Sequence, residues 1–167
     1  MTVASGRLDG LRRWLGIEAN RATGLDQVVG AVGGAVAIGA GLLISRDALG
    51  LAGASVMVPS TGATAVLVFS VPHGPLSQPW AVVGGHVVSA LVGVTCALLL
   101  PGPVVAAACA VGLAIGVMRV LRCVHPPGGA TALVAVIAGA PVHDLGYSFV
   151  VRPVLLNALV MVAVGMA

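Results

Sequence analysis

Charged and aromatic side chains are scarce in this sequence. Only 8% of its 167 residues are charged and 3% are aromatic, whereas 59% are hydrophobic. Soluble domains average about 25% charged and about 45–50% apolar residues. So few charges cannot cover a surface that faces water, which excludes a soluble fold. We expect an integral membrane protein of one domain, because the length leaves no room for a membrane bundle plus a soluble domain of ordinary size.

Cysteine is also rare, and the spacing of the three cysteines matches no disulfide or metal-binding pattern. Cys96, Cys109 and Cys123 form neither a CxxC pair nor a Cys/His ligand pattern. This excludes a disulfide framework and a typical zinc site. The sequence also lacks a Ser/His/Asp set and a paired-carboxylate site, so we expect no enzyme activity and no cofactor.

Positive charge gathers near the start of the chain, within a formal net charge of +3. The arginines before the first apolar stretch are Arg7, Arg12, Arg13 and Arg21. In a soluble protein this excess would suggest a nucleic acid. In a membrane protein it marks the cytoplasmic side, so we expect the lipid bilayer and no nucleic acid as partner, with a cytoplasmic N-terminus in a bacterial inner membrane.

Residues 1–26 are predicted to form this cytoplasmic segment. Apolar residues of the segment share one helical face, which suits a short amphipathic helix lying on the membrane surface. They are Leu8, Leu11, Trp14 and Leu15. A solvated tail is the alternative interpretation.

Four long apolar runs follow, each near the roughly 20 residues that cross about 30 Å of hydrocarbon. They are Val28–Ser45, Ala81–Leu100, Val104–Leu121 and Ser148–Ala167. Two further apolar stretches, Leu49–Val71 and Pro126–Ala140, carry proline and glycine near their starts or middles. Because proline interrupts helical hydrogen bonding, these two are predicted to be short or broken helices.

The two interrupted stretches share the pattern P-x-x-G-A-T-A, at Pro59–Ala65 and Pro126–Ala132. The same offset aligns Ala81–Leu100 with Ser148–Ala167. The pattern predicts an all-α membrane bundle of two repeats, about 27–100 and 101–167, each with two full spans and one short or broken helix that starts at Pro and Gly. A chance match in an Ala-rich chain is the alternative.

Charge placement favours one topology. If both interrupted stretches cross the membrane, the repeats are inverted, Arg119 and Arg122 join the N-terminus in the cytoplasm, and Asp144 lies outside. If both stretches re-enter without crossing, the two arginines lie outside, against the positive-inside rule. We therefore favour six crossings.

The two interrupted helices supply the candidate site. Pro126 and Pro127 are expected to begin a helix whose Gly-rich first turn leaves N–H groups exposed, and such a helix start attracts anions. A second start is expected at Pro59, so valine at Gly62 or Gly129 should block binding. The candidate substrate-binding residues are Pro59, Thr61, Gly62, Ala63, Thr64, His86, His125, Pro126, Pro127, Gly128, Gly129, Ala130, Thr131 and Asn157.

Several of these side chains have a second interpretation. His125 could bind an anion or couple proton movement to transport, or it could only cap its helix. His86 and Asn157 could be ligands or could bond between helices. The threonine hydroxyls, among them Thr64 and Thr131, could donate to the anion or back to their own helix.

Two stretches resemble the HPP family of integral membrane proteins. The run His125–Leu133 resembles the motif that names the family, and Pro75–Pro79 with Val83–Gly93 resembles its other characteristic stretch. The resemblance covers Val28 to Ala167. Family members are described as four-helix membrane proteins, which differs from the six crossings expected here, and plant plastid and cyanobacterial members are associated with nitrite transport.

The resemblance implies a transporter or channel for a small monovalent anion, with nitrite first. A noncatalytic membrane subunit or sensor that regulates a partner protein is the alternative. Helices rich in Gly and Ala can also associate with a second copy, so a homo-oligomer is an open expectation.

Overall fold

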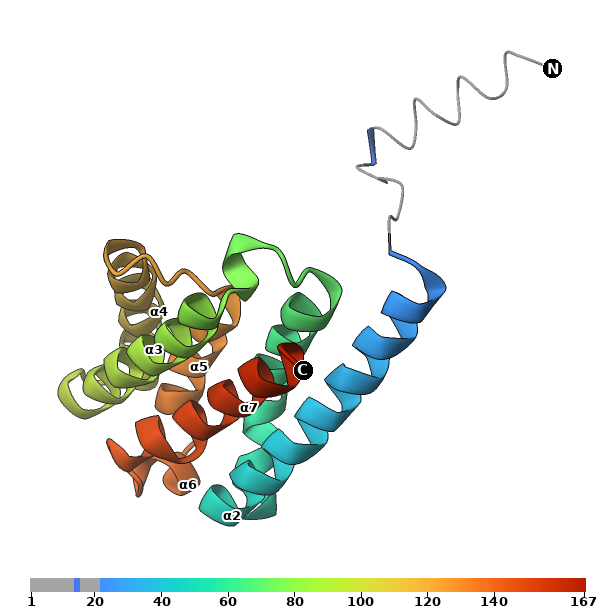
Figure 1. Cartoon of the computed structure of the whole chain (residues 1–167). Coiled ribbons are helices and arrows are strands. Elements are labelled where there is room, and N and C mark those ends of the chain that lie inside the picture. Colours follow the sequence, from blue (N-terminus) through green and yellow to red (C-terminus); the bar gives the residue numbers. More distant parts are fainter. Residues whose placement is uncertain (1–13, 16–21) are drawn as a thin grey trace.

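The structure is a computed structural model that describes residues 14–15 and 22–167. Every regular element in this part of the chain is a helix, as the sequence predicts (Figure 1). The elements are α2 (Gly24–Ser70), the 3₁₀ turn η1 (Pro75–Ser77), α3 (Pro79–Leu99), α4 (Pro103–Val120), α5 (Pro126–Ile137), α6 (Ala140–His143), the π-helical turn η2 (Val150–Leu155) and α7 (Leu156–Gly165). Of the residues assigned to the amphipathic N-terminal helix, only Trp14 and Leu15 are described, and both are exposed.

Helix α2 consists of two antiparallel arms. Thr23 caps its start, because the Thr23 hydroxyl accepts from the Asp26 N–H while the Asp26 carboxylate accepts from the Thr23 N–H. The chain reverses at Gly50, whose φ of 69° and ψ of 177° are open to glycine alone. The first arm (24–49) and the second arm (51–70) lie side by side, and a Cβ on Gly33 would be 2.7 Å from the Phe69 ring.

The second arm contradicts the prediction of a broken segment over Leu49–Val71. It continues through Pro59, which lies inside the helix and faces outward, so no helix begins there and no N–H groups are exposed. A single proline removes one backbone hydrogen bond, which a membrane helix can accommodate. By contrast α5 begins at Pro126, as predicted, where two prolines stand together.

The last predicted span, Ser148–Ala167, is interrupted instead of continuous. The helix breaks at Arg152, whose φ of −125° and ψ of 110° are extended. The next residue is Pro153, and a residue before proline is pushed out of the helical region. The second half of the chain therefore contains the short helix α5 and, after it, a helix that is interrupted at Arg152. Arg152 forms an ion pair with Asp47 of the first arm.

Successive segments run in opposite directions, which gives the bundle two ends (Figure 1). At one end the connections 71–78 and 121–125 meet, because the indole N–H of Trp80 donates to the Leu121 carbonyl at 3.0 Å. The start of α2 lies at this end too. At the opposite end Gly53 packs against Pro141. The connections between successive segments thus alternate between the two ends of the bundle.

The outer surface of the bundle is apolar. Helices α2, α3 and α4 are long and apolar enough to cross a bilayer, and α5 and 150–165 are shorter apolar helices. Large hydrophobic side chains are exposed along them, including Val36, Leu43, Val66, Leu98, Leu113, Ile115 and Leu159. Small side chains instead fill the contacts between helices, such as Ala90, Ala110, Ala114 and Ala132, which are fully buried. A surface of this kind requires lipid as solvent, so the chain is an integral membrane protein.

The two ends of the bundle should be reachable from opposite sides of the membrane. We expect an impermeant thiol reagent to label Asp144→Cys from outside intact cells, and Arg122→Cys only after permeabilisation, with the three native cysteines replaced by alanine. His73→Cys is the matched control, because residue 73 lies in the connection 71–78, which meets the connection 121–125 that contains Arg122. Labelling of Arg122→Cys and Asp144→Cys from the same side would contradict six crossings.

Candidate functional site

Five polar side chains meet inside the bundle, away from solvent and lipid. Ser60 and Thr64 come from the second arm of α2, His86 from α3, His125 from the residue before α5, and Thr131 from α5. None is more than 4% exposed. We call these five residues the histidine relay.

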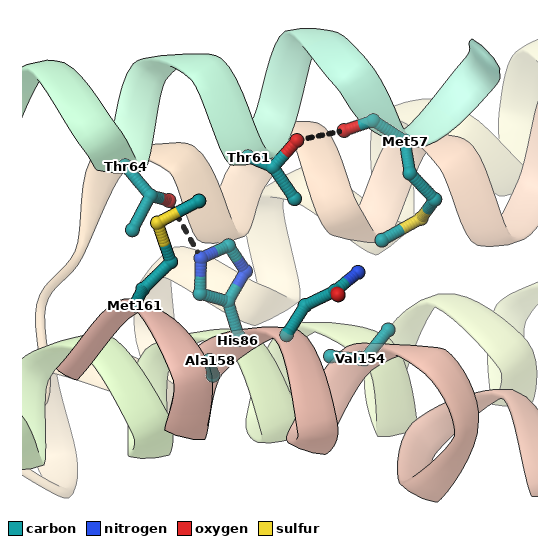
Figure 2. A pocket seen from close by; sticks show the side chains of 8 residues that line it. Met57, Thr61, Thr64, His86, Val154, Ala158 and Met161 are labelled. Carbon is teal, nitrogen blue, oxygen red and sulfur yellow. Dashed lines mark hydrogen bonds between the residues drawn. The ribbon is translucent and has the colours of Figure 1, made fainter. Parts of the chain in front are cut away.

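His86 lies at the centre of the relay, because both of its ring nitrogens are hydrogen-bonded. Its Nε2 lies 2.8 Å from Thr64 Oγ1, and its Nδ1 lies 2.8 Å from Thr131 Oγ1. Figure 2 shows the contact with Thr64. Thr64 Oγ1 also lies 3.1 Å from Nε2 of His125, whose Nδ1 is 2.8 Å from the Leu76 carbonyl oxygen. The two imidazole rings are 4.9 Å apart and inclined by 61°.

Ser60 joins the second arm to α5. Its hydroxyl lies 2.9 Å from the Pro127 carbonyl oxygen and 2.7 Å from Thr131 Oγ1. Each threonine also has a carbonyl of its own helix in reach: Thr64 Oγ1 lies 3.0 Å from Ser60 O, and Thr131 Oγ1 lies 3.4 Å from Pro127 O. Each hydroxyl can therefore bond back to its own helix, as one of the two interpretations expects, and each also lies beside a ring nitrogen of His86.

The network determines the tautomers of two neutral imidazoles. The Leu76 carbonyl can only accept, so Nδ1 of His125 donates and its Nε2 accepts the hydroxyl proton of Thr64. Thr64 then has no proton left for His86, so Nε2 of His86 donates to Thr64. Nδ1 of His86 accepts from Thr131. Every ring nitrogen is satisfied, as burial in a bilayer demands.

Glycines let the helices around the relay approach closely. A Cβ on Gly85 would lie 2.6 Å from the Cβ of His125 and 2.9 Å from the Cys123 carbonyl oxygen. A Cβ on Gly128 would lie 2.8 Å from the Gly85 carbonyl oxygen, and the Gly128 N–H donates to His125 O at 2.9 Å. At Gly128, the start of α5 is thus covered by α3.

A small cavity adjoins the relay. Figure 2 shows it between the second arm of α2, α3 and α7. It has room for about one water molecule. The residues that line it are Met57, Thr61, Thr64, His86, Val154, Asn157, Ala158 and Met161. Thr64 and His86 therefore belong to the relay and to the cavity.

Asn157 brings an unpaired polar atom to this cavity. Its side chain is buried, and its Nδ2 donates to Ser45 Oγ at 2.8 Å. Its Oδ1 has no hydrogen-bond partner and lies close to Gly41. An unpaired buried group costs about 1–3 kcal/mol, so retaining one beside a cavity is a feature that calls for a ligand or a water.

No formal charge lies in the relay or the cavity lining. The described arginines and aspartates are exposed, and among residues 14–15 and 22–167 there is no group of three metal-ligating side chains. Cys123 is buried in the connection beside α3, and burial raises the pKa of its thiol, which keeps it uncharged. The site therefore offers neutral donors and acceptors.

The structure brings together only part of the predicted site. Thr64, His86, His125 and Thr131 meet in the relay, Thr61 and Asn157 line the cavity, and Pro127 accepts from Ser60. Gly128 packs against α3. The remaining candidates make no polar side-chain contact there: Pro59, Ala63 and Pro126 are exposed, and Gly62, Gly129 and Ala130 are half-buried.

Sequence analysis missed Ser60, Ser45, Met57 and Met161. A signal existed for Ser60, because it lies four residues before Thr64 and so on the same helical face. The other three belong to apolar runs in which nothing distinguishes them. Thr61 hydrogen-bonds back to the Met57 carbonyl at 3.0 Å, which is its structural role beside the cavity.

These features define a helical integral membrane protein with a buried polar centre. The model of the transmembrane region of HPP proteins matches residues 19–167, so the chain belongs to the HPP family. Two transmembrane proteins of Dictyostelium discoideum are similar: one is 41% identical over 124 residues, which cover 72% of this chain and 43% of the relative. The other is 41% identical over 109 residues, which cover 63% of this chain and 35% of the relative.

The chain thus spans less than half the length of these two relatives. No solved structure matches it.

A pair of glycine variants tests the close contact between α3 and the start of α5. Gly128→Val should lower the melting temperature in detergent, because overpacking costs about 1–3 kcal/mol and each ~1 kcal/mol shifts Tm by about 2–4 °C. Gly129→Val is the matched control and should melt near wild type, since a Cβ there has no neighbour within 4 Å. Equal melting temperatures for the two variants would contradict the close contact between α3 and α5.

Proposed function

We propose that this protein is a transporter or channel for a small monovalent anion, with nitrite as the first candidate. The observation that carries the proposal is the histidine relay with its adjoining cavity, buried where four helical segments meet. Polar side chains are costly inside a bilayer and commonly mark the route of a substrate.

Neutral donors suit an anion that must also be released. Moving a bare ion into an apolar medium costs tens of kcal/mol in the Born limit, so several groups must replace its water together. The donors would come from the cavity lining, namely the Thr61 and Thr64 hydroxyls, the His86 imidazole and the Asn157 amide, and binding would exchange their present hydrogen bonds for bonds to the anion. Binding by neutral groups remains weak enough for release, as conduction needs. We take nitrite first because plant plastid and cyanobacterial members of the HPP family, which this chain resembles, are associated with nitrite transport.

Passage requires a wider cavity than the structure contains. The cavity has room for about one water molecule, so in this proposal the structure corresponds to an occluded form. We place the movement in α7, because it lines one side of the cavity and begins after the break at Arg152. The exposed ion pair between Arg152 and Asp47 would hold this end of the cavity closed.

Two inverted repeats would explain the symmetry of the relay. Thr64 and Thr131 hold the same position in the P-x-x-G-A-T-A pattern, and they bond to the two nitrogens of His86. Each threonine also lies near the carbonyl four residues earlier. In this proposal the N-terminus lies in the cytoplasm and the membrane is a bacterial inner membrane.

Transport by the purified chain is the direct test. In proteoliposomes supplied with nitrite, nitrate, formate or chloride, we expect nitrite uptake above protein-free vesicles. Thr131→Val should reduce that uptake about tenfold or more, because it leaves Nδ1 of His86 unpaired. Thr95→Val is the control, since its hydroxyl bonds to Leu91 O and Tyr147 outside the relay. Absence of uptake of every anion by folded protein would favour a noncatalytic subunit or sensor.

Asn157 should matter more for transport than for stability. Asn157→Leu removes an unpaired buried oxygen together with the hydrogen bond to Ser45, so the two effects on the melting temperature oppose each other and the net change should stay within about 2–4 °C. Anion uptake should fall. Ser45→Ala is the contrasting variant and should lower the melting temperature, because it removes the partner of Asn157 Nδ2. Loss of stability in Asn157→Leu with unchanged uptake would assign this residue to packing alone.

A further inference from the structure

The hydroxyl of Thr64 has one proton and two acceptors. Nε2 of His125 lies 3.1 Å from Thr64 Oγ1, and the Ser60 carbonyl oxygen lies 3.0 Å from it. Only one of these hydrogen bonds can exist at a time, because Thr64 has a single donor. Nε2 of His86, at 2.8 Å, donates to the same oxygen in either case.

This geometry allows His125 to take up a proton without movement of any heavy atom. An arriving proton forms an N–H bond at Nε2 of His125, and that N–H then donates to Thr64 Oγ1. The Thr64 hydroxyl rotates and donates to the Ser60 carbonyl instead. Nδ1–H of His125 stays on Leu76. No covalent bond breaks within the protein, one N–H bond forms, and the relay gains one positive charge.

The same switch exists at the other side of His86. Thr131 Oγ1 lies 2.8 Å from Nδ1 of His86, and the Ser60 hydroxyl and the Pro127 carbonyl lie 2.7 Å and 3.4 Å from it. A proton on Nδ1 of His86 would donate to Thr131, which would turn its own proton to the Pro127 carbonyl. The extra charge can therefore reside on either imidazole, and His86 lines the cavity.

Within residues 14–15 and 22–167, no charged group contacts the relay and could neutralise that charge. The two imidazole rings lie 4.9 Å apart, and no carboxylate or arginine hydrogen-bonds to them from the described parts of α2, α3, α4, α5 or α7. The charged and titratable groups at the bundle ends are Asp26, Arg46, Asp47, His73, Arg119, Arg122, His143, Asp144 and Arg152, all of them exposed, and Tyr147 is exposed as well. The cysteines Cys96, Cys109 and Cys123 make no hydrogen bond to either ring. An anion in the adjoining cavity is thus the available countercharge.

We propose that the histidine relay binds one proton together with one anion, so that the protein is an electroneutral proton–anion symporter. This inference rests on the proposed anion transport and deepens it. The empty relay is neutral and fully hydrogen-bonded, the loaded site is a neutral ion pair, and the intermediate with a lone charge is avoided. A buried charge without a partner would be far costlier than either end state.

Coupling can be measured directly in proteoliposomes that contain a pH indicator. A potassium gradient with valinomycin sets the membrane potential, and protein-free vesicles correct for nitrous acid that crosses lipid unaided. We expect one proton to enter with each nitrite, uptake to rise as external pH falls because the proton is a co-substrate, and uptake to be insensitive to the imposed potential. Nitrite uptake that follows the potential and moves no protons would overturn the symport and leave anion transport standing. Absence of nitrite uptake would overturn both.

A pair of Thr64 variants tests the switch itself. Thr64→Val keeps the shape of the side chain and removes the hydroxyl, so proton-coupled uptake should fall about tenfold or more. Thr64→Ser keeps the hydroxyl and should retain the ratio of one proton per nitrite with uptake within about twofold of wild type. If Thr64→Val still carries one proton with each nitrite at the wild-type rate, Thr64 is not the switch. The number of protons that enter with each nitrite is also measured on the wild-type protein, so the proposal can be rejected even if Thr64→Val folds poorly.

Discussion

Both ring nitrogens of His86 must find hydrogen-bond partners inside the bundle, and much of the structure follows from this requirement. Lipid supplies no donors or acceptors, and an unpaired polar group in hydrocarbon costs several kcal/mol. The partners are Thr64 and Thr131, which come from helices on two sides of α3. To bring those hydroxyls within 2.8 Å the helices must approach closely, and this is where Gly85 and Gly128 are needed. Gly85 and Gly128 therefore have a structural role, because they allow the close helix packing that gives His86 its hydrogen-bond partners.

The helical bundle could be predicted from the sequence because lipid imposes simple rules on length and composition. The start of α5 at Pro126 was also predictable, because a helix accepts successive prolines in its first turn and not in its interior. The same rule failed at Pro59, where one proline inside an apolar stretch is accommodated and the helix continues. At Pro153 the error was the opposite. The run is continuously apolar, but the proline pushes Arg152 out of the helical conformation and interrupts the helix. Hydropathy measures solvent preference and does not weigh backbone geometry.

The polar residues of the site were predictable one by one, but their connections were not. Thr64, His86, His125 and Thr131 are conspicuous in apolar surroundings, yet Ser60 meets Thr131 across 71 residues of sequence. The predicted ligands were backbone N–H groups at two helix starts, together with these side chains. One start does not exist, and α3 covers the other, because Gly85 is a neighbour that no local motif could reveal. Side-chain hydroxyls and imidazoles occupy the place that backbone donors were expected to hold.

A neutral centre that can accept one proton differs in its energetics from a fixed cation. An arginine at this depth would be costly whenever the site is empty, and it would hold a bound anion strongly. In the proposed symport the relay avoids both problems, because the positive charge would exist only while a proton is bound. Release of the proton then weakens the hold on the anion, which makes dissociation of the two cooperative. The rotation of the Thr64 hydroxyl between His125 and Ser60 is the smallest movement in the bundle that could couple the two events, and it leaves the contacts between the glycines and their neighbours undisturbed.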